Sequence, residues 1–311
     1  MEPRMDAGTK KTRKLRNSQS FKDHVSGYLY IAPFFILFGI FTLFPILWSA
    51  QISFYSWNIL GNKEFIGFQN FIWLLTDDPR FWKAVGNTFT LWIISTIPQL
   101  FFALVLATVL NQSMLKGKAL FRTAALIPNV TSLVAVAVIF GSIFGTHYGI
   151  LNWLLSQLGF DKFNWLASYW GAQFAVALMV TWRWLGYNAI IYLAALQSIP
   201  SDIYEAARID GASRVQQFFN ITIPMMRPII LFTVIVSTVG GMQLFVEPMI
   251  FAGDQGGSKG QVLTMVLYLY TTAFTNNQFG YASAIAWLMF LIIVAFSVFN
   301  FYLTRKINSA D

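Results

Sequence analysis

The sequence contains no cysteine, and only two of its 311 residues are histidines. Without cysteine, the chain forms no disulfide framework and offers no thiolate nucleophile or metal ligand. The two histidines, His24 and His147, lie far apart in the sequence, so a histidine-based centre has little material to work with. We therefore expect no catalytic residues, no metal site and no cofactor in this chain.

Charged residues are also scarce, at 11% of the chain against about 25% in a typical soluble domain. Hydrophobic residues make up 56%. A soluble core of this size cannot hide so much apolar side chain, so the chain belongs in a lipid bilayer. The sequence has no G-x-x-x-x-G-K-[ST] phosphate loop, which predicts that it neither binds nor hydrolyses ATP.

Six stretches are long and apolar enough to cross a bilayer as helices, which needs about 20 residues each. They run from Tyr28 to Ser53, Val85 to Leu110, Phe121 to Phe144, Trp170 to Leu196, Ile229 to Phe251 and Tyr281 to Leu303. Pro33 and Pro45 are expected to kink the first stretch. The predicted fold is all-α, with six transmembrane helices in one domain at 25–305 and a short tail at 306–311.

Basic residues are distributed unevenly around these stretches, and this asymmetry predicts an orientation. If the N-terminus is cytoplasmic, the external segments hold only Lys63, Arg80, Lys83, Lys162 and Lys259. Residues 1–24 then form a basic cytoplasmic tail before an uncleaved first span. We predict a multi-pass protein of the cell membrane with both termini in the cytoplasm, and no nucleic-acid partner despite the net charge of +8.

The segment 200–228 lies between two apolar stretches and is dense in charge. Ser201 is expected to cap the N-terminus of a first short helix, with Asp202 in its first turn. Gly211 is expected to end that helix in the left-handed conformation.

A second short helix is expected to follow the first. Ser213 and Gln216 have the spacing of a capping box, and Pro224 and Pro228 are expected to stop this helix before the next apolar run. Such a helix pair at a membrane face is a natural docking element for a soluble partner. Local sequence signals alone leave one alternative to a docking role open, in which this segment is a plain amphipathic cytoplasmic connector.

The same segment carries a family resemblance. Glu205-Ala206-Ala207, Gly211 four places on, and Ile221-Thr222-Ile223-Pro224 match the EAA signature of permease subunits in binding-protein-dependent ABC importers, with Ile223 in place of the usual Leu. The resemblance implies a type I importer fold that works by alternating access. It assigns ATPase coupling to Glu205, Ala206, Ala207, Asp210, Gly211 and Pro224.

Shorter motifs extend the resemblance over roughly residues 25–305 and point to the carbohydrate-uptake branch, which includes maltose-, oligosaccharide- and glycerol-phosphate-type permeases. These motifs are Asn70-Phe71, Asn87-Thr88, Phe121-Arg122 with Ile127-Pro128, Gly149 with Asn152, Gln197-Ser198-Ile199-Pro200 and Phe279-Gly280-Tyr281-Ala282-Ser283-Ala284. The T-x-GGP-type turn common in that branch is replaced by Ala252-Gly253-Asp254-Gln255-Gly256-Gly257. The implied partners are a pair of ATPase subunits, a second homologous permease, an extracytoplasmic sugar-binding protein and the sugar.

Arg183 and Glu247 are the ionisable residues inside the predicted spans, where charge is costly. One interpretation pairs them with each other or with backbone carbonyls. In the other, they line a polar path and bond sugar hydroxyls. The two interpretations are not exclusive.

Side chains around this pair favour a path. Trp182, Trp184, Tyr187 and Asn188 offer aromatic faces and an amide for a sugar. Gly240, Gln243 and Glu247 would share a face of the fifth helix, although close helix packing also explains Gly240 and Gly241. By resemblance, the expected path residues are Trp182, Arg183, Gly186, Asn188, Gly240, Gln243 and Glu247.

Three alternatives to a sugar permease are kept open. A glycerol-phosphate permease of the same family would use similar motifs. A secondary transporter would depend on an ion gradient and no ATPase. A membrane enzyme would need a cluster of acids, bases or metal ligands at one membrane face, for which the sequence offers little.

Overall fold

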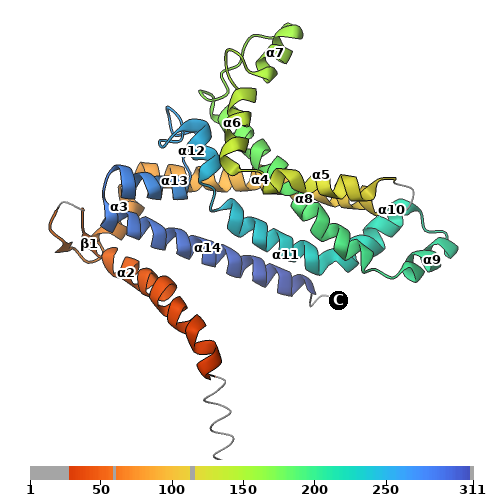
Figure 1. Ribbon diagram of the computed structural model, residues 1–311, viewed down its shortest axis with the longest axis horizontal. Helices are drawn as coiled ribbons and strands as arrows, with labels where there is room; N and C mark the ends of the chain where they lie inside the picture. The colour runs from red at the N-terminus through yellow and green to blue at the C-terminus, as the bar shows by residue number, and fades with distance from the viewer. Residues whose placement is uncertain (1–27, 59–60, 113–115, 309–311) are drawn as a thin grey trace, which may run out of the picture.

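The computed structural model describes residues 28–58, 61–112 and 116–308, with side chains up to Tyr302. The tail predicted at 1–24 lies outside the described residues. Four long helices lie side by side: α4 (Pro79–Asn111), α8 (Tyr169–Gln197), α11 (Ile223–Gly241) and α14 (Phe279–Asn308) (Figure 1). The all-α membrane fold expected from the sequence is confirmed.

The core of this bundle is the contact between α4 and α8. Ala103 and Ala107, one turn apart on α4, are fully buried against Ala189, Tyr192 and neighbouring side chains of α8. Small residues at this spacing let two helix backbones approach closely, which is how helices associate within a bilayer.

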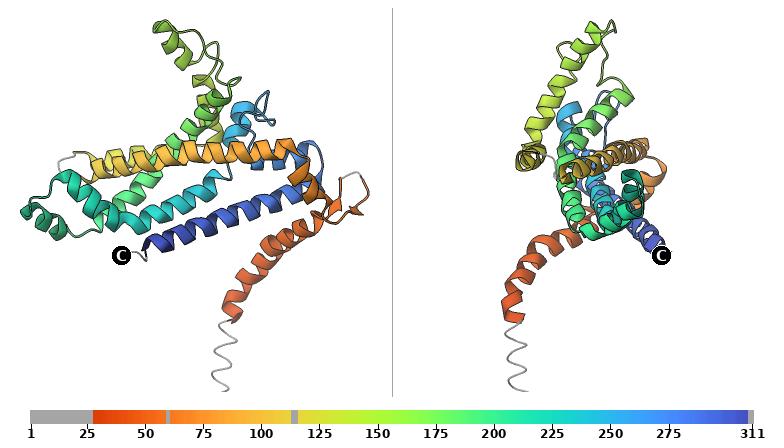
Figure 2. Two further views of the ribbon diagram at one scale, coloured as in Figure 1. Left: turned by 180° about the vertical axis from the view of Figure 1, so that it is seen from behind. Right: turned by 90° about the vertical axis from the view of Figure 1, so that its right-hand side faces the viewer.

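Five helices in the described part of the chain are long and apolar enough to span a membrane, and a bent pair brings the number to six. The first, Tyr28–Ile52, contains a π-helical turn, η1 (Gly39–Leu43), and continues as α2 (Phe44–Ile52). Its N-terminal part diverges from the other helices (Figure 2), whereas near its C-terminal end the Trp287 indole of α14 donates to the Ser49 hydroxyl at 3.3 Å. None of its most apolar window is buried.

The third predicted span is not one straight helix. It consists of α5 (Lys118–Val130) and α6 (Leu133–Ile143), which meet at an angle of 92°. Pro128 removes a backbone donor near the end of α5, and the extended residues Thr131 and Ser132 are poor helix formers. After the bend, α6 leads away from the bundle to α7 (Ile150–Gln157) (Figure 1).

The fifth predicted span, Ile229 to Phe251, is also wrong in its extent. Helix α11 ends at Gly241, and a separate helix, α12 (Val246–Ala252), follows a short turn. Two consecutive glycines weaken the end of α11. Pro248 then falls in the first turn of α12, where its missing N–H costs little.

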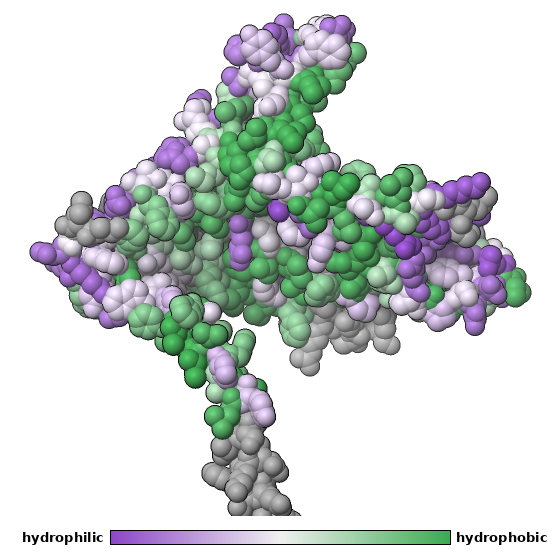
Figure 3. All heavy atoms as spheres, viewed as in Figure 1, coloured by the Kyte–Doolittle hydropathy of each residue, from purple (hydrophilic) through white to green (hydrophobic). Residues whose placement is uncertain are grey.

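Short elements gather at the two ends of the long helices. The α9 end carries α9 (Ser201–Ile209), α10 (Arg214–Gln217) and η2 (Phe218–Thr222). The α3 end carries α3 (Gln69–Thr76), α13 (Met265–Tyr270), η3 (Thr271–Thr275) and a hairpin of β1 (Tyr55–Ser56) and β2 (Glu64–Phe65). The strands are antiparallel, pairing Tyr55 with Phe65. Hydrophilic residues lie at both ends and hydrophobic residues between them (Figure 3).

Candidate functional site

The helix pair at the α9 end largely follows local sequence signals. Asp202 lies in the first turn of α9, as expected, but Pro200 occupies the N-cap position. Ser201 is therefore the first helical residue, and its hydroxyl lies 3.3 Å from an Asp202 carboxylate oxygen instead of capping the helix. The predicted cap was wrong by one residue because Pro200 already has the extended backbone that a cap needs.

The turn between the two helices is as expected. Gly211 has a left-handed backbone with φ of +80°, and the N–H of Ala212 donates to the Ala207 carbonyl at 2.9 Å. Ser213 and Gln216 then form the capping box, with bonds of 2.8 and 3.3 Å. No atom lies within 4 Å of the position that a β-carbon on Gly211 would take. Only backbone conformation therefore makes glycine favourable here.

The two prolines do not stop the second helix, contrary to expectation. Residues Arg214–Gly241 form one continuous helix that passes through η2 and includes both Pro224 and Pro228. The wide π-helical turn η2 ends two residues before Pro224, just as η1 ends two residues before Pro45. A π-helical turn bonds i to i+5, so the chain passes the proline ring without losing its helical direction.

The EAA residues lie on an open surface. The side chain of Glu205 is 63% exposed and lies 3.7 Å from Arg208, its i+3 neighbour. Ala206, Asp210, Gly211 and Pro224 are exposed as well, and Ala207 is half-buried. Large apolar side chains are also exposed on this helix pair: Ile203, Ile209, Val215 and Phe219.

A side-chain bond fastens α9 to the long helix that contains α10 and α11. The hydroxyls of Tyr204 on α9 and Thr222 in η2 lie 2.9 Å apart. Thr222 is buried and belongs to the same continuous helix as α11, so this bond ties α9 to a helix long enough to span the membrane.

A cavity of about 140 Å³ lies between α4, α8 and α11, in the middle of the bundle. Its polar lining consists of Thr96, Gln99, Asn188 and Ser237, together with the aromatic residues Trp184 and Tyr187. Gly240, Gly241 and the apolar residues Val180, Val236 and Leu244 complete the wall. The lining has no charged side chain among the described residues.

Of the seven expected path residues, the structure brings Asn188 and Gly240 together at this cavity. Sequence reasoning missed Gln99 and Thr96 on α4. The available signal was the two polar residues of Thr96-Ile97-Pro98-Gln99 within an apolar run. Polar side chains inside a membrane span are costly and often line a functional site.

Arg183 and Glu247 pair with each other and do not line the cavity. The Arg183 Nη1 and Glu247 Oε1 atoms are 3.8 Å apart, and the two side chains are 18% and 5% exposed. The guanidinium also lies 5.4 Å from the centre of the Trp184 ring. The pair joins α8 to α12, which supports the interpretation in which these charges hold the bundle together.

The remaining expected path residues do not line the central cavity. Because α11 ends at Gly241, Gly240, Gln243 and Glu247 do not share a helical face, and Gln243 lies exposed in the turn. The Trp182 ring lies 5.7 Å from that of Phe140 on α6. Gly186 packs against Ala125 of α5, with no cavity between them.

A second buried polar cluster lies at the α3 end, around Asn87 of α4. Its amide nitrogen donates to the carbonyls of Gly260 and Leu263, at 2.8 and 3.0 Å. Its oxygen accepts from Tyr169 and Gln173 of α8, at 3.1 and 3.3 Å. This cluster therefore fixes the loop between α12 and α13 to both α4 and α8.

Asp78 makes a comparable junction nearby. One carboxylate oxygen caps α4 by accepting from the backbone of Arg80 and Phe81, and the other accepts from the hydroxyls of Tyr268 and Tyr281 at 2.6 Å each. Burial and the adjacent carboxylate raise the pKa of the Tyr268 phenol, so this hydroxyl remains a hydrogen-bond donor.

Comparisons with known proteins identify the family. Residues 78–309 match the model of the binding-protein-dependent transport system inner membrane component. The chain is 39% identical to the lactose transport system permease protein LacF of Rhizobium radiobacter, over 91% of this chain and 95% of that protein. It is 33% identical to the arabinooligosaccharides transport system permease protein AraP of Halalkalibacterium halodurans, over 91% and 89% of the two chains.

A solved structure supports the fold. The chain superposes with a TM-score of 0.81 on a bacterial ABC transporter involved in the import of the acidic polysaccharide alginate, at 24% identity over 94% of this chain and 99% of that chain. The helical arrangement is thus that of an ABC importer permease. The chain belongs to the family of inner membrane components of binding-protein-dependent transport systems, as a non-catalytic, multi-pass membrane subunit.

Proposed function

We propose that this chain is the permease subunit of an ATP-driven importer of neutral sugars, with its translocation path at the cavity between α4, α8 and α11. The observation that carries the proposal is the lining of that cavity. Gln99 and Asn188 offer amide donors and acceptors, and Trp184 and Tyr187 offer aromatic faces. This combination suits a ligand with hydroxyl groups and C–H faces.

The same lining favours a sugar over glycerol phosphate. A phosphate in a bilayer needs a compensating cation, and the described lining has none. Arg183, which precedes the lining residue Trp184 in the sequence, could have supplied such a cation, but it is paired with Glu247. The names of the relatives point in the same direction, since LacF and AraP belong to transport systems for lactose and arabinooligosaccharides.

We further propose that α9 and α10 form the element that couples this chain to an ATPase subunit. Glu205 is exposed and available for a charge-assisted bond. Exposed Ile203, Ile209 and Val215 beside it give a mixed apolar and charged surface of the kind that a protein partner buries. The Tyr204–Thr222 bond would pass a movement of α9 to α11 and so alternate access to the cavity.

The proposed orientation places the α9 end in the cytoplasm and the α3 end outside, with both termini inside. The distribution of lysine and arginine along the sequence supports it. The other proposed partners are a second homologous permease and an extracytoplasmic sugar-binding protein. A related solved transporter was captured with an alginate pentasaccharide-bound periplasmic protein, and the family name itself specifies a binding protein.

Sugar uptake into proteoliposomes tests this proposal. The complete complex, with its ATPases and binding protein, is expected to accumulate neutral disaccharides or oligosaccharides only when ATP is supplied on the ATPase side. Glycerol 3-phosphate should not compete for uptake. Uptake driven by a proton or sodium gradient without ATP would overturn the proposal in favour of a secondary transporter.

A further inference from the structure

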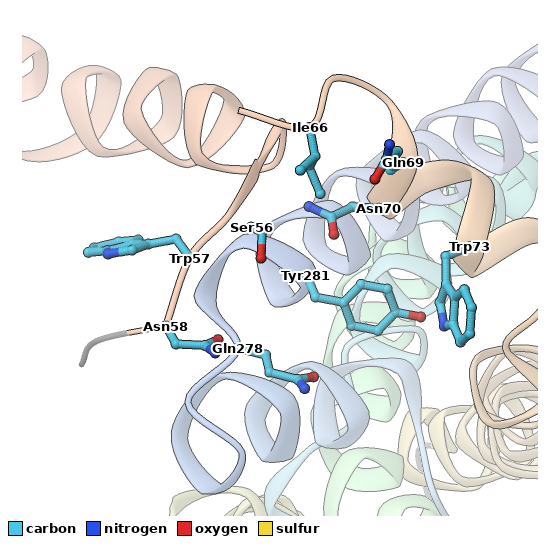
Figure 4. Close-up of a pocket in the computed structure, with 9 residues that line it drawn as sticks. All are labelled: Ser56, Trp57, Asn58, Ile66, Gln69, Asn70, Trp73, Gln278 and Tyr281. Atoms are coloured by element: carbon cyan, nitrogen blue, oxygen red, sulfur yellow. The ribbon is translucent and has the colours of Figure 1, made fainter. Parts of the chain in front are cut away.

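A polar pocket at the α3 end is separate from the central cavity and has no role in the function proposed above. Its volume is about 420 Å³, which lies within the range of about 300–1,000 Å³ typical of small-molecule sites. The residues that line it come from three distant parts of the chain: Ser56, Trp57, Asn58, Ile66, Gln69, Asn70, Trp73, Gln278 and Tyr281 (Figure 4).

Hydrogen bonds hold the hairpin side of this pocket in place. Asn70 is buried, and its amide donates to the carbonyls of Ser53 and Tyr55 at 2.8 and 3.1 Å. This fixes the start of the β1–β2 hairpin to α3. Asn58 also bridges to Gln278, which joins the chain after β1 to the start of α14.

The α14 side is fixed as tightly. Gly280 approaches Tyr55 so closely that a β-carbon would lie 1.9 Å from the Tyr55 carbonyl oxygen. The hydroxyl of Tyr281 is held by Asp78 at 2.6 Å. Asn277 has a left-handed backbone with φ of +57°, which ends η3 and sets the position of Gln278. The pocket is therefore preformed, so a ligand would pay little to order it.

The other polar side chains that line the pocket are uncharged and are free to bond a ligand. Within the described part of the chain, the side-chain amides of Asn58, Gln69 and Gln278 have no hydrogen-bond partner in the protein, and all three residues are exposed. The indole of Trp73 is 57% exposed, and the Tyr281 ring points toward it (Figure 4). The indole of Trp57 points away from the other lining residues.

This composition selects among ligand classes. A phosphate, a carboxylate or an amine would need an opposite charge, and the described lining supplies none. Free amides beside an indole and a phenol ring match the hydroxyls and C–H faces of a neutral sugar. We propose that this pocket binds one unit of a neutral sugar at the external mouth of the permease. This rests on the proposed orientation and function.

Direct binding to the assembled complex, without ATP or binding protein, tests this proposal. Because the chain has no native cysteine, an environment-sensitive fluorophore can be attached to this subunit at Ser56→Cys alone or, as a second reporter, at Ile66→Cys. The complex in phosphatidylcholine nanodiscs is titrated with lactose, maltotriose, glucuronate and glycerol 3-phosphate. We expect a saturable response to lactose or maltotriose and none to the two anions.

Variants assign the response to the pocket. Gln278→Ala and Trp73→Ala should each weaken the apparent affinity about three- to tenfold, the usual effect of losing one hydrogen bond or ring contact. Gln157→Ala on α7 and Trp170→Ala at the start of α8 are matched controls outside the pocket and should leave it unchanged. Asn188→Ala, in the central cavity, should also leave the Ser56 signal unchanged.

The outcomes separate this inference from the proposed function. If the complex imports sugar but neither reporter responds to lactose or maltotriose, the outer site is refuted and the function stands. If the reporters respond but ATP drives no uptake, the outer site stands and the proposed function fails. A signal that changes with the lipid headgroup and not with added sugar would also overturn the outer site.

Discussion

Gly186 of α8 lies directly against Ala125 of α5, so that a β-carbon at Gly186 would be 1.7 Å from the Ala125 carbonyl oxygen. Backbone cannot retreat from such a contact as a flexible side chain would. Glycine is therefore required here for helix packing, although its neighbours Trp184 and Asn188 line the central cavity. The contact also fixes α5, the helix before the 92° bend, to α8.

Gly186→Ala should destabilise the protein by about 1–3 kcal/mol, the typical cost of overpacking. Thermal unfolding in detergent measures the change. Gly86→Ala is the matched control, since it is a helical glycine with no atom within 4 Å of its β-carbon position. Alanine is the better helix former, so this control should be neutral or slightly stabilising. Equal melting temperatures for the two variants would contradict the packing role.

Gln99→Ala and Asn188→Ala should raise the KM of sugar uptake several-fold without loss of assembly. Each removes one amide from the central cavity, worth about 1 kcal/mol of hydrogen bonding. Gln243→Ala serves as the comparison, because Gln243 is exposed in the turn after α11. Uptake kinetics in proteoliposomes provide the measurement. A larger KM change for Gln243→Ala would move the path toward the residues first expected from the sequence.

Arg183→Ala and Glu247→Ala should each reduce thermal stability more than the double substitution does. Removing one partner leaves the other charge buried without compensation, whereas removing both leaves none. A double-mutant cycle on the melting temperature isolates this coupling. Strictly additive effects would show that the two charges do not act as a pair.

Gly211→Val should uncouple ATP hydrolysis from transport while leaving the protein in the membrane. A side chain in the left-handed conformation costs about 1–2 kcal/mol, and this strain would tilt α9 relative to α10. Gly211→Asn is the control, because asparagine tolerates that conformation. Substrate-stimulated ATPase activity of the complex measures coupling. Loss of activity in both variants, or in neither, would refute the explanation from backbone conformation.

Crosslinking tests the docking surface itself. Ala207→Cys introduces the only thiol of this subunit, and it lies half-buried on α9 beside exposed Glu205. In an active complex it should crosslink to an ATPase subunit. Trp170→Cys, at the start of α8, should not. If α9 and α10 give no crosslink at any position, the coupling role is wrong.

Local signals predicted the α9 end well, because caps and turns depend on neighbours a few residues away. The Ser213–Gln216 box and the left-handed Gly211 are both as expected. Hydropathy likewise located the long helices, since bilayer thickness sets their length. Both kinds of signal can be read from a single continuous stretch of sequence.

The errors arise where distant residues decide the structure. The turn after α11 is held by a distant residue, because the hydroxyl of Thr264 donates to the carbonyl of Leu244, twenty residues earlier. The helix Arg214–Gly241 continues through Pro224 because a π-helical turn precedes this proline, and no sequence pattern predicted that turn. The outer pocket unites β1, α3 and the start of α14, so its members could not be grouped before the fold was known.

Asn87 gives the α3 end a mechanical property. One side chain holds the carbonyls of Gly260 and Leu263 while accepting bonds from two residues of α8. If α4 slid along α8 by one residue, about 1.5 Å, these bonds would all be strained together. At this end the four bonds therefore resist sliding of α4 along α8 and hold the loop between α12 and α13 to both helices.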